Sequence, residues 1–128
     1  MNRILVVEDE ELIRTMVEIN LESQKFKVRS CESAEDMMEI LEEETFDVIL
    51  LDIFLPGMNG DEALREIRKK SIQTPVIMVT AKSNLQTKLD SFEHGADDYI
   101  SKPFDVQELQ ARVKALIRRH KPEITAKN

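Results

Sequence analysis

Apolar residues follow two alternating patterns along this chain of 128 residues. Five short apolar or alternating runs predict β-strands over residues 4–7, 26–30, 48–52, 76–79 and 98–101. After each run the apolar residues recur at helical spacing, and the helices are expected to begin near Glu10, Ser33, Gly60, Leu85 and Asp105. The pattern therefore predicts five strands that alternate with five helices.

Local signals support these helices. Ser33 precedes Asp36, and Asp105 precedes Glu108, with the spacing at which an N-cap side chain and a returning acid both bond the helix start. The first helix places four apolar residues on one face, namely Ile13, Met16, Val17 and Leu21. That face is expected to pack on the core.

The alternation of strands and helices predicts an α/β fold with a parallel sheet covered on both faces, because βαβ crossovers are right-handed. The run at residues 48–52 has the character of a strand buried on both faces, whereas residues 26–30 and 98–101 are more polar. The flavodoxin-like (βα)5 three-layer sandwich, with the strand order 2-1-3-4-5, puts these polar strands at the edges.

Polar residues follow four of the predicted strands, at the sheet edge where open α/β folds bind ligands. They are Glu8, Asp9, Asp52, Thr80 and Lys102. Taken alone, Asp52 could equally begin a turn. The residues at the other strand ends favour a shared site.

Three carboxylates raise one another's proton affinity unless a cation lies among them. Oxygen ligands without Cys or His favour Mg²⁺ or a similar hard ion such as Mn²⁺. The residues predict phosphoryl transfer to a carboxylate, with Asp52 as nucleophile and Asp9 and Asp52 on the metal, Glu8 acting through water. Lys102 and Thr80 would bind the phosphoryl oxygens.

The charge of the chain narrows the classes of partner. The formal net charge is −7, and residues 1–60 carry 5 basic against 15 acidic side chains, while residues 61–128 carry 13 against 10. Such a domain should repel nucleic acid, so we expect no direct contact with it.

The single Cys31 reads as a buried, inert thiol. The apolar start is too short for a signal peptide or a membrane span, so a cytoplasmic location is expected.

Four motifs together resemble the receiver domain of two-component response regulators, the CheY-like fold. They are Asp9 with its acidic neighbour and the stretches at residues 52–60, 80–82 and 102–104. The resemblance implies that Asp52 takes a phosphoryl group from the phosphohistidine of a sensor histidine kinase and that Mg²⁺ is required. It also implies that the backbone carbonyl of Phe54 binds the metal and that the peptide bond before Pro103 is cis.

The family implies a switch rather than a conventional enzyme, one that catalyses its own phosphorylation and dephosphorylation. Phosphorylation of Asp52 would draw Thr80 inward, and Tyr99 would follow into the vacated space. Without the switch, Tyr99 reads as a half-buried strand aromatic with a wet hydroxyl. Phe54 and Lys82 would flank the phosphoryl group and set its hydrolysis rate.

A narrower resemblance is to the OmpR/PhoB subfamily of transcriptional regulators, carried by residues 95–99, 102–104 and 108–119. Members dimerise on phosphorylation through the fourth helix, fifth strand and fifth helix. Carried over by position, the intermolecular ion pairs are Lys88 with Glu108, Asp98 with Arg112, and Asp97 with Arg119, around an apolar patch of Leu89, Phe92 and Ala111. An ordinary solvated face would explain the same charges.

The expected domain covers residues 1–120, and the polar residues 121–128 read as the start of a linker or a disordered tail. Members of the subfamily carry a DNA-binding output domain after the receiver. The chain is then either an isolated receiver domain of a longer regulator or a natural stand-alone receiver.

Three other classes fit less well. A haloacid-dehalogenase-like phosphatase also forms an aspartyl-phosphate, but it has a second Asp where this chain has Phe54. A nucleotide-binding module would have a Gly-rich loop after the first strand, where acids stand instead. A receiver-like module that is never phosphorylated is disfavoured because all five site residues are present.

Overall fold

The computed structural model describes the backbone of residues 1–81 and 85–120, and all the side chains of these residues except 85–88. The strands are β1 (Arg3–Val7), β2 (Lys27–Cys31), β3 (Val48–Asp52), β4 (Val76–Thr80) and β5 (Asp98–Ser101). The helices are α1 (Glu11–Glu22), α2 (Ala34–Glu43), α3 (Gly60–Lys69), α4 (Leu85–Glu93) and α5 (Val106–His120). The predicted alternation is confirmed, with strand bounds shifted by about one residue.

The strands form one parallel sheet in the order β2-β1-β3-β4-β5, as predicted. Every residue of β3 and β4 is buried, whereas β2 alternates between exposed and partly buried positions and only its last residue is buried. The fold is thus the flavodoxin-like sandwich, and its most apolar strands lie in the middle because both of their faces are covered.

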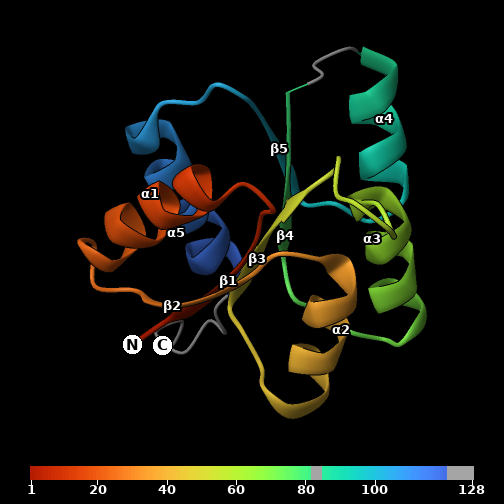
Figure 1. The fold of residues 1–128 in the computed structure, drawn as a ribbon, viewed down its shortest axis with the longest axis horizontal. Coiled ribbons are helices and arrows are strands. Elements are labelled where there is room, and N and C mark those ends of the chain that lie inside the picture. The colour runs from red at the N-terminus through yellow and green to blue at the C-terminus, as the bar shows by residue number, and fades with distance from the viewer. Residues whose placement is uncertain (82–84, 121–128) are drawn as a thin grey trace, which may run out of the picture.

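Helices cover both faces of the sheet, α1 and α5 on one side and α2, α3 and α4 on the other (Figure 1). Each face has its own apolar core. Leu21, Leu109 and Leu116 pack in the core under α1 and α5, and Met37, Leu64 and Ile67 pack in the core under α2 and α3. Because β1, β3, β4 and β5 are parallel neighbours in the sheet, their carboxyl ends lie side by side at one edge.

Helix starts follow the predicted signals only in part. Ser33 accepts a hydrogen bond from the Asp36 N–H, as expected of an N-cap. Asp105 instead accepts from the Gln107 N–H, one residue earlier than expected, and the Glu108 side chain contacts Arg112. The complete capping box lies at α3, between Asn59 and Glu62.

The predicted apolar face of α1 is only partly buried. Val17 and Leu21 are buried, but the side chain of Met16 is 38% exposed. Leu12 and Ile19, which the pattern did not place on this face, are 87% and 60% exposed. The outer side of α1 thus presents apolar residues to solvent. Within residues 1–81 and 85–120, no helix is long and apolar enough to cross a membrane.

Candidate functional site

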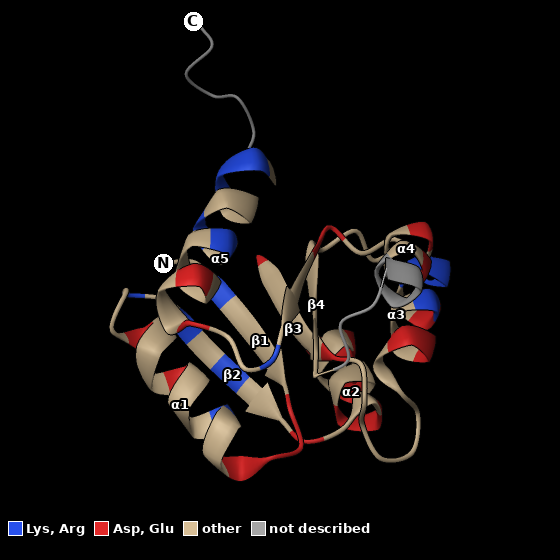
Figure 2. Ribbon diagram, turned by 90° about the horizontal axis from the view of Figure 1, so that it is seen from above, with Lys and Arg blue, Asp and Glu red and all other residues tan. Residues whose placement is uncertain are grey.

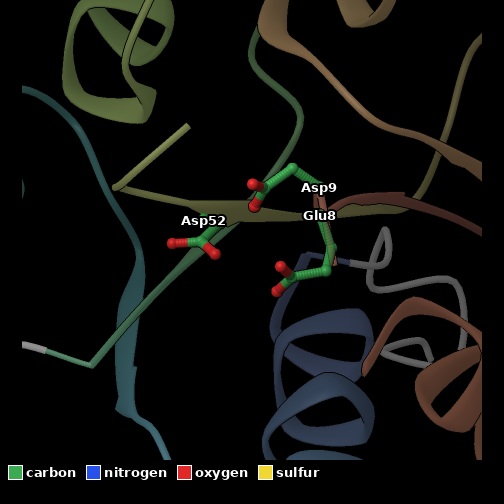
Figure 3. A group of neighbouring side chains, drawn as sticks. All are labelled: Glu8, Asp9 and Asp52. Carbon is green, nitrogen blue, oxygen red and sulfur yellow. The ribbon is translucent and has the colours of Figure 1, made fainter. Parts of the chain in front are cut away.

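The structure brings the predicted site residues together at the carboxyl edge of the sheet. Glu8 and Asp9 directly follow β1, and Asp52 is the last residue of β3. Thr80 ends β4, and Lys102 directly follows β5. Figure 3 shows the three carboxylates gathered around one space at the ends of β1 and β3. The site forms because parallel strands that lie next to one another all end at this edge.

Lys102 links the two buried carboxylates of the site. Its Nζ lies 2.7 Å from Glu8 Oε1 and 2.7 Å from Asp52 Oδ2. The other oxygens accept backbone hydrogen bonds, Glu8 Oε2 from the Glu10 N–H at 3.1 Å and Asp52 Oδ1 from the Phe54 N–H at 3.0 Å. The Lys102–Pro103 peptide bond is cis, as the resemblance implies. The two carboxylates are thereby held in fixed directions.

Burial shifts the pKa values of Glu8 and Lys102. Loss of solvent raises the pKa of Glu8, and the nearby charge of Asp52 adds to the effect against the hydrogen bonds from Lys102 and Glu10. Burial also opposes the charge of Lys102, but its hydrogen bonds to Asp52 and Glu8 outweigh burial and raise the pKa of Lys102. The Lys102 side chain is therefore a charged ammonium at neutral pH, placed between the two carboxylates.

The carboxylates also fit a hard metal ion. Ligand oxygens of Glu8, Asp9 and Asp52 can all lie within 4.8 Å of one another. Asp9 is exposed, so this group opens to solvent beside the two buried carboxylates. An all-oxygen set with one exposed member suits Mg²⁺, which keeps several of its waters. The carboxylate oxygens gathered here are thus ligands of the kind that the predicted Mg²⁺ requires.

The turn after β3 holds Asp52 from behind. A Cβ built on Gly60, the first residue of α3, would lie 2.1 Å from the carbonyl oxygen of Asp52. The Gly60 N–H donates to the Ile53 carbonyl at 2.8 Å. Across the turn, Glu35 Oε2 accepts a hydrogen bond from the Met58 N–H at 3.1 Å. The start of α3 therefore packs directly on the backbone of Asp52, which only glycine allows.

The two expected switch residues are both buried. Thr80 has no exposed surface, and its carbonyl accepts a 2.7 Å hydrogen bond from the Lys102 N–H. Tyr99 is 5% exposed and packs in the core under α2 and α3. The expectation of a half-buried Tyr99 is therefore wrong, and burial raises its pKa. Lys82 lies outside the described residues.

Residues expected at a dimer interface have partners within the chain. Arg112 Nη1 lies 2.9 Å from Asp98 Oδ1, and Nη2 lies 3.0 Å from Glu108. Asp97 accepts from Arg68 at 3.1 Å and from the Val76 N–H at 2.9 Å. Glu108, Ala111 and Arg119 are exposed, and the Lys88 side chain lies outside the described residues.

Leu89 and Phe92 are each 46% exposed on α4. The C-terminal end of α5 carries a basic band in Figure 2, formed by Arg118 and Arg119 with His120 beside them. The expected patch is therefore open on its apolar side, while the acid at Asp98 and the base at Arg112 already neutralise each other.

Several contacts were not expected from the sequence. His94 Nδ1 lies 3.2 Å from Asp61, and His120 Nε2 lies 3.6 Å from Asp97, although no acid near either histidine in sequence signals a partner. Arg68 binds the Gly95 carbonyl at 2.8 Å and ties α3 to the start of β5. Each contact joins residues distant in the chain, so sequence spacing carries no signal for it.

The thiol of Cys31 is buried as expected, and burial raises its pKa to about 11. Cys31 also lines an open pocket of about 430 Å³ between α1, β2 and α2, apart from the three carboxylates.

Comparisons with known proteins agree with this geometry. The family model described as the response regulator receiver domain matches residues 4–114. A Francisella response regulator receiver domain is 29% identical, with a TM-score of 0.91, over 94% of this chain and 100% of that chain. A BeF3-activated DrrB receiver domain is 39% identical, with a TM-score of 0.85, over 93% and 99%. A putative response regulator from Chloroflexus aurantiacus is 32% identical, with a TM-score of 0.87, over 92% and 98%.

Proposed function

This chain belongs to the response regulator receiver family of two-component systems, and on that premise we propose that Asp52 is its phosphoacceptor. The observation that carries the proposal is the hydrogen bonding of its carboxylate, by Lys102 at 2.7 Å and by the Phe54 N–H at 3.0 Å. A carboxylate held in this way is oriented for attack at the strand end, beside the exposed Asp9. The proposed donor is the phosphohistidine of a sensor histidine kinase.

In the proposed transfer an Asp52 oxygen forms a bond to phosphorus while the phosphorus–nitrogen bond of the donor breaks, and the imidazole nitrogen keeps the electron pair. Asp9, Asp52 and the Phe54 carbonyl would hold Mg²⁺, with Glu8 acting through water. The ion supplies charge neutralisation for the phosphoryl oxygens when it is bound.

The residues of the chain itself have separate tasks in this scheme. Lys102 would leave Asp52 Oδ2 and bind a phosphoryl oxygen, which its short distance to the carboxylate supports. The Thr80 hydroxyl would donate a hydrogen bond to another phosphoryl oxygen, and Thr80 would couple the site to β4 and to Tyr99. The same groups would support self-catalysed dephosphorylation, so the domain itself would set how long it stays phosphorylated.

The proposal is tested by intact mass after incubation with Mg²⁺ and a small phosphodonor. We expect a gain of one phosphoryl group that is absent in Asp52→Asn and absent with EDTA. A folded wild-type domain that gains no mass with ample donor would overturn the proposal and favour a receiver-like module that works unphosphorylated.

We propose that the kinase docks on the outer side of α1. Leu12 and Ile19 are exposed there, and an apolar groove of about 340 Å³ runs from Met16 to Phe104 past Lys102. Because Lys102 both lines the groove and contacts Asp52, a helical partner on α1 could bring its phosphohistidine to Asp52. Leu12→Asp should then slow transfer from the phosphorylated kinase at least about tenfold, a loss of about 1.4 kcal/mol.

Small-donor phosphorylation separates docking from chemistry. Leu12→Asp should leave it unchanged, and Gln73→Asp, which adds the same charge at an exposed position in the loop before β4, is the control. Equal kinase transfer to Leu12→Asp and the wild type would exclude this surface.

We further propose that the domain belongs with the OmpR/PhoB subfamily and dimerises when phosphorylated through α4, β5 and α5. The exposed Leu89 and Phe92 support this, since they are large apolar side chains on one helix face. Asp98 and Arg112 would exchange their intrachain bond for an equivalent bond across the interface, so the exchange itself should contribute little. The apolar contacts would then provide most of the affinity.

Sedimentation with Mg²⁺ and BeF3⁻, the group that activates the DrrB receiver domain, tests this dimer. We expect dimers of the wild type and monomers of Phe92→Asp, while Asp98→Arg should be rescued by the added Arg112→Asp change. Dimers of Phe92→Asp would place the interface on another face.

A further inference from the structure

The loop that joins β1 to α1 carries both Glu8 and Asp9. The N-cap residue of α1, Glu10, makes no side-chain hydrogen bond to the helix start. The Glu8 N–H donates to the Cys31 carbonyl at 3.1 Å, which anchors only the beginning of the loop. The Glu10 N–H bonds the Glu8 side chain, which leaves the carbonyls of Glu8 and Asp9 to be held by another group.

Arg14 supplies that contact. From the first turns of α1 its Nη1 donates to the Glu8 carbonyl at 2.9 Å and approaches the Asp9 carbonyl at 3.4 Å. These are the carbonyls of two of the three acidic residues of the site. A peptide plane is rigid, so fixing its carbonyl limits the direction of the neighbouring Cα–Cβ bonds. The guanidinium therefore holds the loop from which both carboxylates project.

Arg14 does not act by neutralising the acids. Among the residues that the structure describes it forms no ion pair, whereas Lys102 contacts both Glu8 and Asp52. Arg14 faces the cavity beside β2 and α2, together with Arg29. Its hydrogen bonds to the site go to backbone carbonyls.

We infer that Arg14 is a positioning residue for the metal site, which sets the directions of Glu8 and Asp9 through their carbonyls. The inference rests on the proposed function, in which these carboxylates take Mg²⁺. The change in Mg²⁺ affinity on removal of Arg14 has opposite directions for a positioning role and for an electrostatic role. Removing a positive charge near an acidic site should strengthen cation binding, whereas releasing the loop should weaken it.

The experiment compares Mg²⁺ affinity of the unphosphorylated full chain, measured by calorimetry, for the wild type, Arg14→Met and Arg14→Lys. Arg14→Met should bind Mg²⁺ about tenfold more weakly, the lower end of what partners of metal ligands contribute. Arg14→Lys keeps a donor in the same region and should recover part of the loss. Arg29→Met removes the same charge from the same cavity without touching the loop, and should bind as well as the wild type or slightly better.

Amide hydrogen exchange without metal provides a second measurement. The Glu10 N–H, which donates to Glu8 Oε2, should exchange faster in Arg14→Met but not in Arg29→Met. Unchanged or tighter Mg²⁺ binding by Arg14→Met would overturn the inference while the proposed function stands. A wild type that binds no Mg²⁺ would overturn the proposed function and this inference with it.

Discussion

Lys102 lies 2.7 Å from Asp52 and spans from it to Glu8, so an ammonium group occupies the place between two buried carboxylates. A metal ion and this ammonium compete for the same negative charges. The relationship explains how the domain keeps an acidic site stable without metal, and it leads to opposite effects of one substitution on binding and on chemistry.

Lys102→Met is expected to bind Mg²⁺ several-fold more tightly than the wild type, because the competing cation is gone. It should also slow phosphorylation from a small phosphodonor by at least about a hundredfold, the usual cost of losing a group that stabilises developing charge. Calorimetry and intact-mass time courses measure the two effects. The control Lys114→Met loses the same charge at an exposed position on α5 and should change neither. Weaker Mg²⁺ binding by Lys102→Met would contradict the competition.

Glu8→Gln is expected to stabilise the metal-free domain at pH 7. The pKa of Glu8 is raised in the fold, so its contribution to stability is fully present below its ordinary value of 4.5 and is lost as pH rises through the folded value. The melting temperature of Glu8→Gln should exceed that of the wild type by a few degrees at pH 7 and match it near pH 4.

Calorimetric melting across this pH range in EDTA gives the comparison, and the exposed Glu42→Gln serves as control. A difference between Glu8→Gln and the wild type that stays constant with pH would rule out ionisation of Glu8 as the cause.

Gly60→Ala is expected to destabilise the domain by more than about 2 kcal/mol, because its Cβ would meet backbone atoms that cannot move without displacing Asp52. Gly57→Ala offers a matched comparison. Its Cβ would meet only the end of the Glu35 side chain, although an L residue at its φ of +75° costs about 1–2 kcal/mol. Urea unfolding should therefore rank Gly60→Ala as the less stable of the two, and the reverse order would contradict the close packing of α3 on β3.

Ser91→Ala is expected to stabilise the domain. Among the residues that the structure describes, the buried Ser91 hydroxyl of α4 has no hydrogen-bond partner, and such a group costs about 1–3 kcal/mol. Thr15→Ala on the exposed side of α1 measures the gain from helix propensity alone, about 0.5 kcal/mol. Urea unfolding of both variants should show a clearly larger gain for Ser91→Ala, and equal gains would mean that the hydroxyl carries no penalty.

Much of the fold was predictable because its signals are local. The apolar run that ends in Asp52 identified a central strand, and the alternation of strands with helices determined a parallel sheet. Parallel strands end at one edge, so the convergence of Glu8, Asp52, Thr80 and Lys102 followed from strand order alone. The N-cap at Ser33 was likewise predictable, because it depends on a contact between residues only three apart in the sequence.

Only the tertiary structure decided which charged groups pair and which apolar residues stay exposed. Glu108 bonds to Arg112 rather than to its own helix start, and Asp97 bonds to Arg68 within the chain. Met16 fits the apolar face of α1 but is partly exposed at the groove beside Phe104. The sequence by itself determined the elements, their order and the residues at the strand ends, because periodicity and turn chemistry act over a few residues. The partners of Arg14, Arg68 and Lys102 depend on distances between separate elements, which exist only once the helices have packed on the sheet.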